Sequence, residues 1–107
     1  MNDAIRKELD IIARLLTESL HPKAIYLFGS FADGTQVEKS DFDIYVVIPD
    51  DGMRPLEAMQ KANRALYPSQ RRPVDVLVGR YSDFLRRREL PTIERTVYKT
   101  GKILYGG

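Results

Sequence analysis

The chain has 107 residues, with 17 Lys and Arg against 15 Asp and Glu, no cysteine and a formal net charge of +2. This length predicts one domain over residues 1–107, with a modest core and no room for a second substrate-binding lobe. The lack of cysteine excludes a disulfide framework and a thiolate zinc site. The chain opens without a signal-peptide pattern and has no apolar run long enough to span a membrane, so we expect a soluble, cytosolic protein.

Apolar periodicity predicts a helix at the start of the chain. Asn2 or Asp3 can cap this helix, and His21-Pro22 ends it. A short apolar strand over residues 24–28 follows. The helix is therefore expected to cover a sheet with its apolar face. The residues on that face are Ile5, Leu9, Ile12 and Leu16.

The middle of the chain predicts a strand, a helix and another strand. A strand over residues 42–48 leads into a turn at residues 49–52. A second helix opens at Pro55 and stops at Pro68. A third strand is expected over residues 74–78. The helix residues predicted to point inward are Leu56, Met59, Ala62 and Leu66.

The last third predicts two short helices and an extended end. Ser82 is expected to cap the first of these helices, and Thr92 caps the second, which Gly101 terminates. Residues 103–105 add a last extended piece. Together the elements predict an α/β (α+β) fold in which helices pack on a small mixed β-sheet.

Two aspartates stand at the start of the second strand. Because side chains alternate along a strand, Asp41 and Asp43 project from one face, about 7 Å apart at Cα, while Phe42 and Ile44 enter the core. Two carboxylates on one face repel each other unless a cation lies between them. Mg²⁺ is the candidate, because it binds through one or two carboxylates together with substrate phosphates.

Gly29-Ser30, at the end of the first strand, adds a candidate phosphate site. Glycine lets the backbone approach a phosphate closely, and serine supplies a hydroxyl and caps the helical turn that follows. Read singly, this pair is an ordinary turn, and the two aspartates are charges that protect a strand from aggregation. Read together, they predict a site for a metal-bound triphosphate.

Asp75 is the only charge inside the apolar stretch between Pro73 and Gly79. A carboxylate in a buried strand is costly unless it is paired or binds a metal. The alternative is that Asp75 points to solvent from a strand that is buried on one face only. If this strand neighbours the one that carries Asp41 and Asp43, three acids meet at one point.

As a set, these motifs resemble the signature of minimal nucleotidyltransferases (MNT) of the polymerase-beta-like nucleotidyltransferase superfamily. The motifs are Gly29-Ser30, Ser40–Ile44 and Val74–Val76, and Ile93–Val97 and Gly101–Tyr105 also resemble the closing segment of such domains. The resemblance therefore covers most of the chain.

The resemblance also implies roles for particular residues. Asp41 and Asp43 would hold two divalent ions, and Asp75 would complete the site of the metal that activates the attacking hydroxyl. Gly29 and Ser30 would hold the triphosphate. The three aspartates are thus expected to be both the metal ligands and the catalytic residues.

The resemblance further implies the reaction and the partner. Minimal nucleotidyltransferases accompany HEPN-domain toxins as antitoxins, and they neutralise the toxin by transferring AMP from ATP to its tyrosine. A protein that neutralises its partner by binding alone is the competing hypothesis. Transfer to a small molecule is disfavoured, because the relatives that do so carry additional domains. Direct nucleic-acid binding is not expected, since the arginines lack interleaved aromatic residues.

Two features of charge bear on this choice. Residues 1–60 hold six Lys and Arg against eleven Asp and Glu, whereas residues 61–107 hold eleven against four. This asymmetry is typical of an acidic catalytic side and a basic partner side. Asp33 stands where many family members have a basic residue. Either its side chain points to solvent, or it weakens phosphate binding and catalysis.

Overall fold

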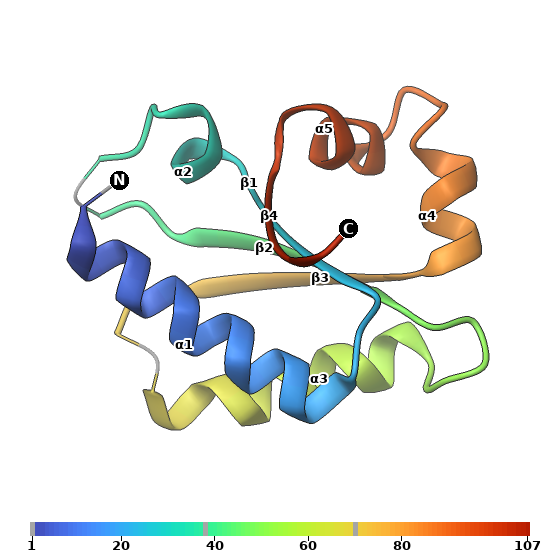
Figure 1. Ribbon diagram of the computed structural model, residues 1–107, viewed down its shortest axis with the longest axis horizontal. Helices are drawn as coiled ribbons and strands as arrows, with labels where there is room; N and C mark the ends of the chain where they lie inside the picture. The colour runs from blue at the N-terminus through green and yellow to red at the C-terminus, as the bar shows by residue number, and fades with distance from the viewer. Residues whose placement is uncertain (1, 38, 70) are drawn as a thin grey trace.

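The computed structural model describes residues 2–37, 39–69 and 71–107, and in these residues four strands form one mixed sheet (Figure 1). The order across the sheet is β3-β2-β1-β4. β1 pairs antiparallel with β2 and β4, and β2 pairs parallel with β3. The strands are β1 (Ala24–Phe28), β2 (Phe42–Ile48), β3 (Val74–Arg80) and β4 (Lys102–Gly106). The predicted mixed sheet with packed helices is confirmed.

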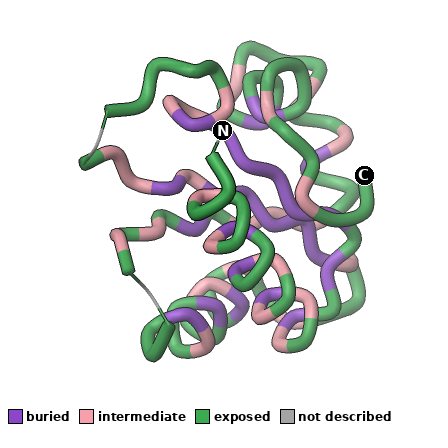
Figure 2. The backbone as a smooth tube through the Cα atoms, turned by 60° about the vertical axis from the view of Figure 1, so that its left-hand side comes forward, coloured by how far each residue is buried: buried purple, intermediate pink, exposed green. Residues whose placement is uncertain are grey.

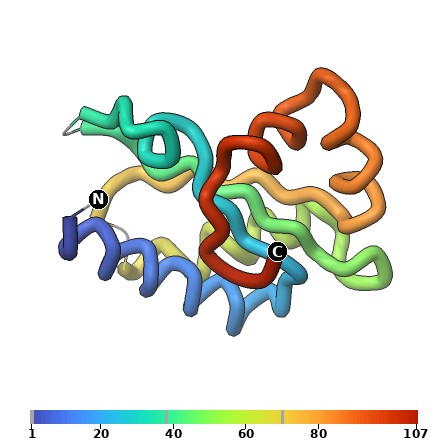
Figure 3. Tube along the Cα trace, turned by 45° about the horizontal axis from the view of Figure 1, so that its top comes forward, coloured from blue at the N-terminus to red at the C-terminus, as the bar shows by residue number. Residues whose placement is uncertain are grey.

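Helices cover both faces of this sheet. Figure 1 shows α1 and α3 on one side and α4 and α5 on the other, while α2 lies near the end of β1. Figure 3 shows the C-terminal strand β4 beside the start of β1. The helices are α1 (Asp3–Leu20), α2 (Ser30–Asp33), α3 (Pro55–Leu66), α4 (Tyr81–Arg87) and α5 (Ile93–Thr100), with a 3-10 turn at Tyr67–Ser69.

The ends of α1 follow the predicted signals. The Asn2 side chain accepts a hydrogen bond from the Ile5 N–H at 2.8 Å, which caps the first turn. His21 ends the helix in the left-handed region with φ 47°, directly before Pro22. No helix in the described part of the chain has the length and apolarity needed to cross a bilayer.

The main core lies between the sheet and the helices α1 and α3. Figure 2 shows that the buried residues concentrate in the central strands. Phe42, Ile44, Val46 and Ile48 of β2 all enter this core, as their alternation predicts. The predicted face of α3 is partly wrong, because Ala58 is buried and Leu56 is 65% exposed. The small alanine side chains form the buried stripe, which lets α3 approach its neighbours closely.

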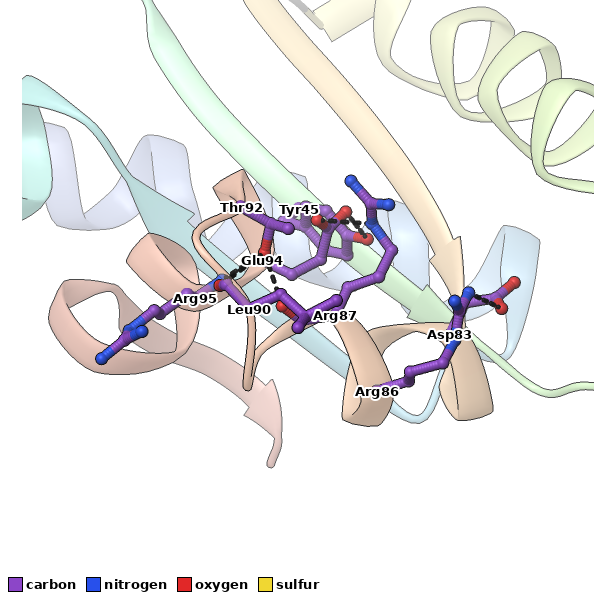
Figure 4. A network of polar contacts seen from close by, with 8 residues as sticks. All are labelled: Tyr45, Asp83, Arg86, Arg87, Leu90, Thr92, Glu94 and Arg95. Carbon is purple, nitrogen blue, oxygen red and sulfur yellow. Dashed lines mark hydrogen bonds and ion pairs between the residues drawn. The ribbon is translucent and has the colours of Figure 1, made fainter.

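A second cluster packs between the other face of the sheet and the helices α4 and α5. Tyr26 and Tyr45 are buried there against Phe84. The Tyr45 hydroxyl donates to the Glu94 carboxylate at 2.8 Å, and Arg87 Nε donates to the same carboxylate at 2.9 Å (Figure 4). This network joins β2, α4 and α5.

The network determines the charge state of its own members. Burial, reinforced by the hydrogen bond to Glu94, raises the pKa of Tyr45, so its hydroxyl keeps its proton. Burial by itself would raise the pKa of Glu94, but the hydrogen bonds from Tyr45 and Arg87 outweigh it and hold this pKa below its ordinary value. Glu94 is therefore an ionised carboxylate with partners on both oxygens.

β3 extends beyond the predicted residue 78. It continues through Gly79 to Arg80, because a side chain at position 79 would collide with the Tyr45 hydroxyl and glycine leaves this space free. The helix α4 then starts at Tyr81, so Ser82 lies inside it and is not the predicted cap. The N–H of Ser82 instead donates to the Asp50 carboxylate at 2.9 Å.

The contact between Gly79 and Tyr45 is testable. Gly79→Ala is expected to lower the free energy of unfolding by about 1–3 kcal/mol, because the new methyl group must displace the Tyr45 ring from its packed position. In a Tyr45→Phe background the same change should cost less, since the hydroxyl that meets the methyl group is gone. Urea unfolding followed by circular dichroism measures both costs, and equal costs in the two backgrounds would contradict this contact.

Candidate active site

The parallel pairing of β2 and β3 brings two of the predicted site residues together. Asp43 and Asp75 are register partners, so their Cα atoms lie on neighbouring strands about 4.8 Å apart in the hydrogen-bonding direction. Asp41 directly precedes β2. Asp43 and Asp75 lie on the face of the sheet that is opposite to α1 and α3, at the end where β2 and β3 begin.

Gly29, directly after β1, lies against the Asp43 carboxylate. Its φ of 72° is in the region that favours glycine, and a Cβ at this position would collide with the Asp43 carboxylate. Phe28, the register partner of Asp43 on β1, places Gly29 there. Gly29 also precedes α2, so the N–H groups of Ser30 and Phe31 in the first turn have no intrahelical partner.

In the part of the chain that the structure describes, the carboxylates of the site have no positive charge paired with them to offset their own. Burial raises the pKa of Asp43, and the negative charges of Asp75 and Asp41 raise it further. Among the described residues, no Lys or Arg forms an ion pair with these three acids. A divalent cation is the kind of ligand that this donor set fits, because it would relieve the repulsion that raises the pKa.

The three carboxylates are not gathered around one point. Within the described ranges, no three Asp, Glu, His or Cys side chains form a group able to hold one metal ion. Asp75 is exposed, so the expectation of a buried strand is wrong, and the alternative of a solvent-facing Asp75 is correct. A shared ion would therefore require the carboxylates of Asp41 and Asp75 to turn toward Asp43.

Asp33 does not face the acidic site. Its carboxylate accepts from the Thr35 hydroxyl at 2.6 Å and from the Thr35 N–H at 3.0 Å, closing a local turn. These hydrogen bonds lower the pKa of Asp33. The side chain is exposed, which matches the first of the two expectations for this residue.

An open hollow adjoins the acidic pair, with a volume of about 490 Å³. Its lining combines the two aspartates with residues that the sequence analysis did not place at the site. These residues are Phe28, Leu77, Met59 and Asn63. The residues of α3 could not be placed there from the sequence, because α3 reaches this edge of the sheet only through tertiary packing. The hollow gives the site room for a substrate larger than a metal ion.

Four of the eight arginines of the basic second half have ion-pair or aromatic partners away from the acidic site. Arg72 pairs with Glu8 at 3.2 Å and its guanidinium stacks on the rings of Phe31 and Phe42. Arg88 lies over the Tyr98 ring, with 4.2 Å between its guanidinium carbon and the ring centroid. These arginines stabilise the fold through packing as well as charge.

The sequence profile of the family "Polymerase beta, Nucleotidyltransferase" matches residues 10–107, and the chain therefore belongs to this nucleotidyltransferase family. The confirmed fold and the pairing of Asp43 with Asp75 at the start of β2 and β3 agree with the membership. A search of curated proteins gives no match.

Solved structures with the same fold include chains of toxin–antitoxin complexes. One, a toxin–antitoxin with AMP-PNP, is 31% identical with a TM-score of 0.60, over 92% of this chain and 73% of that chain. Another, a complex of tri-AMPylated Shewanella oneidensis HEPN toxin with MNT antitoxin, is 25% identical with a TM-score of 0.56, over 95% of this chain and 72% of that chain. A Sulfolobus solfataricus protein provisionally assigned as a nucleotidyltransferase, 21% identical with a TM-score of 0.63 over 99% of this chain and 89% of that chain, supports the fold alone.

The raised pKa of Asp43 predicts a stability effect with a definite sign. A raised pKa means that the folded state binds the proton more tightly than the unfolded chain, so ionised Asp43 destabilises the protein above this pKa. Asp43→Asn should therefore raise the melting temperature at pH 7 without divalent cations, by at most a few degrees because solvent screens this partly exposed carboxylate. This gain should shrink as the pH falls through the pKa of Asp43.

The control is Asp51→Asn, which removes a carboxylate from an exposed turn. It should leave the melting temperature nearly unchanged. Added Mg²⁺ should stabilise the wild-type chain and Asp51→Asn more than Asp43→Asn. Equal stabilisation of all three proteins by Mg²⁺ would contradict a cation site at Asp43.

Proposed function

We propose that this chain is a metal-dependent nucleotidyltransferase in which Asp41, Asp43 and Asp75 hold Mg²⁺ and Gly29 and Ser30 hold the triphosphate. The observation that carries this proposal is the register of Asp43 with Asp75, with Gly29 packed against the Asp43 carboxylate. Membership in the nucleotidyltransferase family supports the reaction class.

The residues at the site suit this chemistry. Bound Mg²⁺ would neutralise phosphate charge and lower the pKa of an acceptor hydroxyl. The exposed carboxylate of Asp75 is free to turn toward Asp43, and the partly buried Asp43 fixes the centre of the ligand set. The first N–H groups of α2 and the Ser30 hydroxyl can donate hydrogen bonds to phosphate oxygens.

The reaction is an in-line displacement. The acceptor oxygen forms a bond to the α-phosphorus, its proton passes to water, and the bond from that phosphorus to the pyrophosphate oxygen breaks. The chain contributes positioning and charge neutralisation. It donates no covalent nucleophile in this scheme.

For the donor and the acceptor we propose ATP and a tyrosine of a HEPN-domain toxin, so that AMP transfer makes this chain an antitoxin. The likeness to a toxin–antitoxin structure with AMP-PNP supports an adenine nucleotide, and the likeness to an MNT antitoxin with a tri-AMPylated HEPN toxin supports the acceptor. The hollow beside Asp75 gives space for an acceptor side chain. A cytosolic location is part of this proposal.

The competing proposal is neutralisation of the partner by binding alone. The excess of eleven Lys and Arg over four Asp and Glu in residues 61–107 favours it, because such a surface suits an acidic partner. Asp33 in the Gly-Ser loop was the other sequence feature in favour of binding alone. It does not support this proposal in the structure, because its carboxylate accepts a hydrogen bond from Thr35. The two proposals differ in whether the partner gains mass.

Co-expression with a HEPN-domain toxin as the partner separates them. Intact-mass spectrometry is expected to show one or more additions of an AMP-sized mass on the partner's tyrosines. Asp43→Asn should reduce this modification at least about 100-fold, the scale seen when a group that stabilises transition-state charge is lost. Asp51→Asn is the matched control and should modify normally. An unmodified partner that is still inhibited by the wild-type chain would instead establish neutralisation by binding.

A further inference from the structure

β3 is an edge strand whose outward backbone groups have no partner in the described residues. Phe42 pairs with Val74, and its N–H donates to the Pro73 carbonyl at 3.1 Å. In a parallel ladder this pattern directs the backbone of alternate residues toward the neighbouring strand and that of the others away from it. The N–H and C=O groups of Val74, Val76 and Val78 therefore point outward from the sheet.

The side chains of β3 alternate between the two faces of the sheet. Val76 is buried in the core under α1 and α3, with Val74 and Val78 packed against it. Asp75 and Leu77 are exposed on the opposite face, the one that carries Asp43. A strand added along this edge would therefore place every second side chain on the face of the three aspartates, one strand spacing from Asp75.

The surroundings of the edge are open and suit an extended segment. The hollow of about 490 Å³ runs from Asp75 and Leu77 to Met59 and Asn63 of α3. The Asn63 side chain is exposed, so its amide is available to a backbone group of an added strand. The apolar surface of Leu77, which is 38% exposed, would be covered by such a strand.

Charge at the two ends of β3 indicates what the segment carries. Arg71 precedes the strand and Arg80 ends it, and the Nε of Arg80 is buried without a hydrogen-bond partner. Cations at both ends complement a segment with acidic residues on either side of its centre. Bound Mg²⁺ would offset the charge of Asp75 itself.

We infer that the edge of β3 docks a hydroxyl-bearing, extended segment of the acceptor protein as an additional strand, with the acceptor side chain on the Asp43 and Asp75 face. This inference rests on the proposed nucleotidyl transfer and specifies how its acceptor is held. Backbone hydrogen bonds to Val74, Val76 and Val78 would supply affinity that depends little on sequence. The acceptor hydroxyl would then meet the nucleotide at the carboxylates.

Synthetic peptides test the docking mode directly. The probe is a blocked, alternating heptapeptide with a central tyrosine and acidic residues near both ends. Two further versions carry N-methyl groups on alternate residues, one version on the odd and the other on the even positions. An extended strand presents alternate N–H groups to the same edge, so one version should lose transfer of AMP from ATP at least about 10-fold and the other should keep it.

Nuclear magnetic resonance of the protein with the peptide, without nucleotide or metal, tests docking independently of AMP transfer. At millimolar concentration the unmodified peptide should shift the amide signals of Val76 and Val78 more than those of Asp75 and Leu77, whose N–H groups face β2. Binding at these amides without any transfer supports docking and contradicts the proposed function. Transfer that is equal for both N-methylated versions, or the absence of shifts at Val76 and Val78, overturns the docking inference and leaves the proposed function standing.

A pair of variants tests the same edge from the side of the protein. Val78→Pro removes the outward N–H without breaking the ladder to β2, whereas Val78→Ala shortens the side chain and keeps the N–H. Val78→Pro should lower transfer to the peptide at least about 10-fold relative to Val78→Ala, with unchanged binding of AMP-PNP. Equal transfer by the two variants, at equal melting temperature, would contradict docking along β3.

Discussion

The pairing of β2 with β3 in one register is the constraint on which the candidate site depends. It places Asp43 opposite Asp75 and leaves Val76 in the core. A slip by one residue would turn Asp75 toward the apolar core and Val76 toward solvent, so the packing that stabilises the sheet also aligns the carboxylates. The valines at alternate positions of β3 therefore specify the geometry of the site without taking part in it.

The acidic end of the sheet carries a cost in stability, whereas the carboxylate that lies farther along the same face is paired. Burial and the charges of Asp75 and Asp41 raise the pKa of Asp43, and position 29 has no room for a side chain beside the Asp43 carboxylate. Farther along β2, on the same face, Tyr45 anchors Glu94 and Arg87 in a network without an unpaired carboxylate oxygen. Acids without a cationic partner among the described residues, as around Asp43, are typical of a ligand-binding site. A carboxylate with a partner on each oxygen, as in Glu94, is typical of a structural network.

Sequence reasoning predicted what local chemistry determines. Residues 24–28 and 42–48 form strands as expected, the caps at Asn2 and Thr92 are present, and the fold class is confirmed. The predictions were wrong where packing between elements far apart in the sequence determines the structure. Ala58 replaces Leu56 on the buried face of α3 because of close helix packing, and Gly79 stays in β3 because of Tyr45 on a neighbouring strand. The exposure of Asp75 follows from the edge position of β3, which no local pattern in the chain encodes.

The central claim is that Asp43 and Asp75 share a divalent cation that binds the nucleotide. A crystal structure with Mn²⁺ and AMP-PNP tests it most directly, because the anomalous signal of Mn²⁺ locates the ion independently of the fitted coordinates. The account predicts an anomalous peak within coordination distance of carboxylate oxygens of both aspartates, with phosphate oxygens completing the ligand set and the triphosphate against Gly29 and Ser30. A nucleotide bound at another place, or a Mn²⁺ peak that touches neither carboxylate, would contradict it.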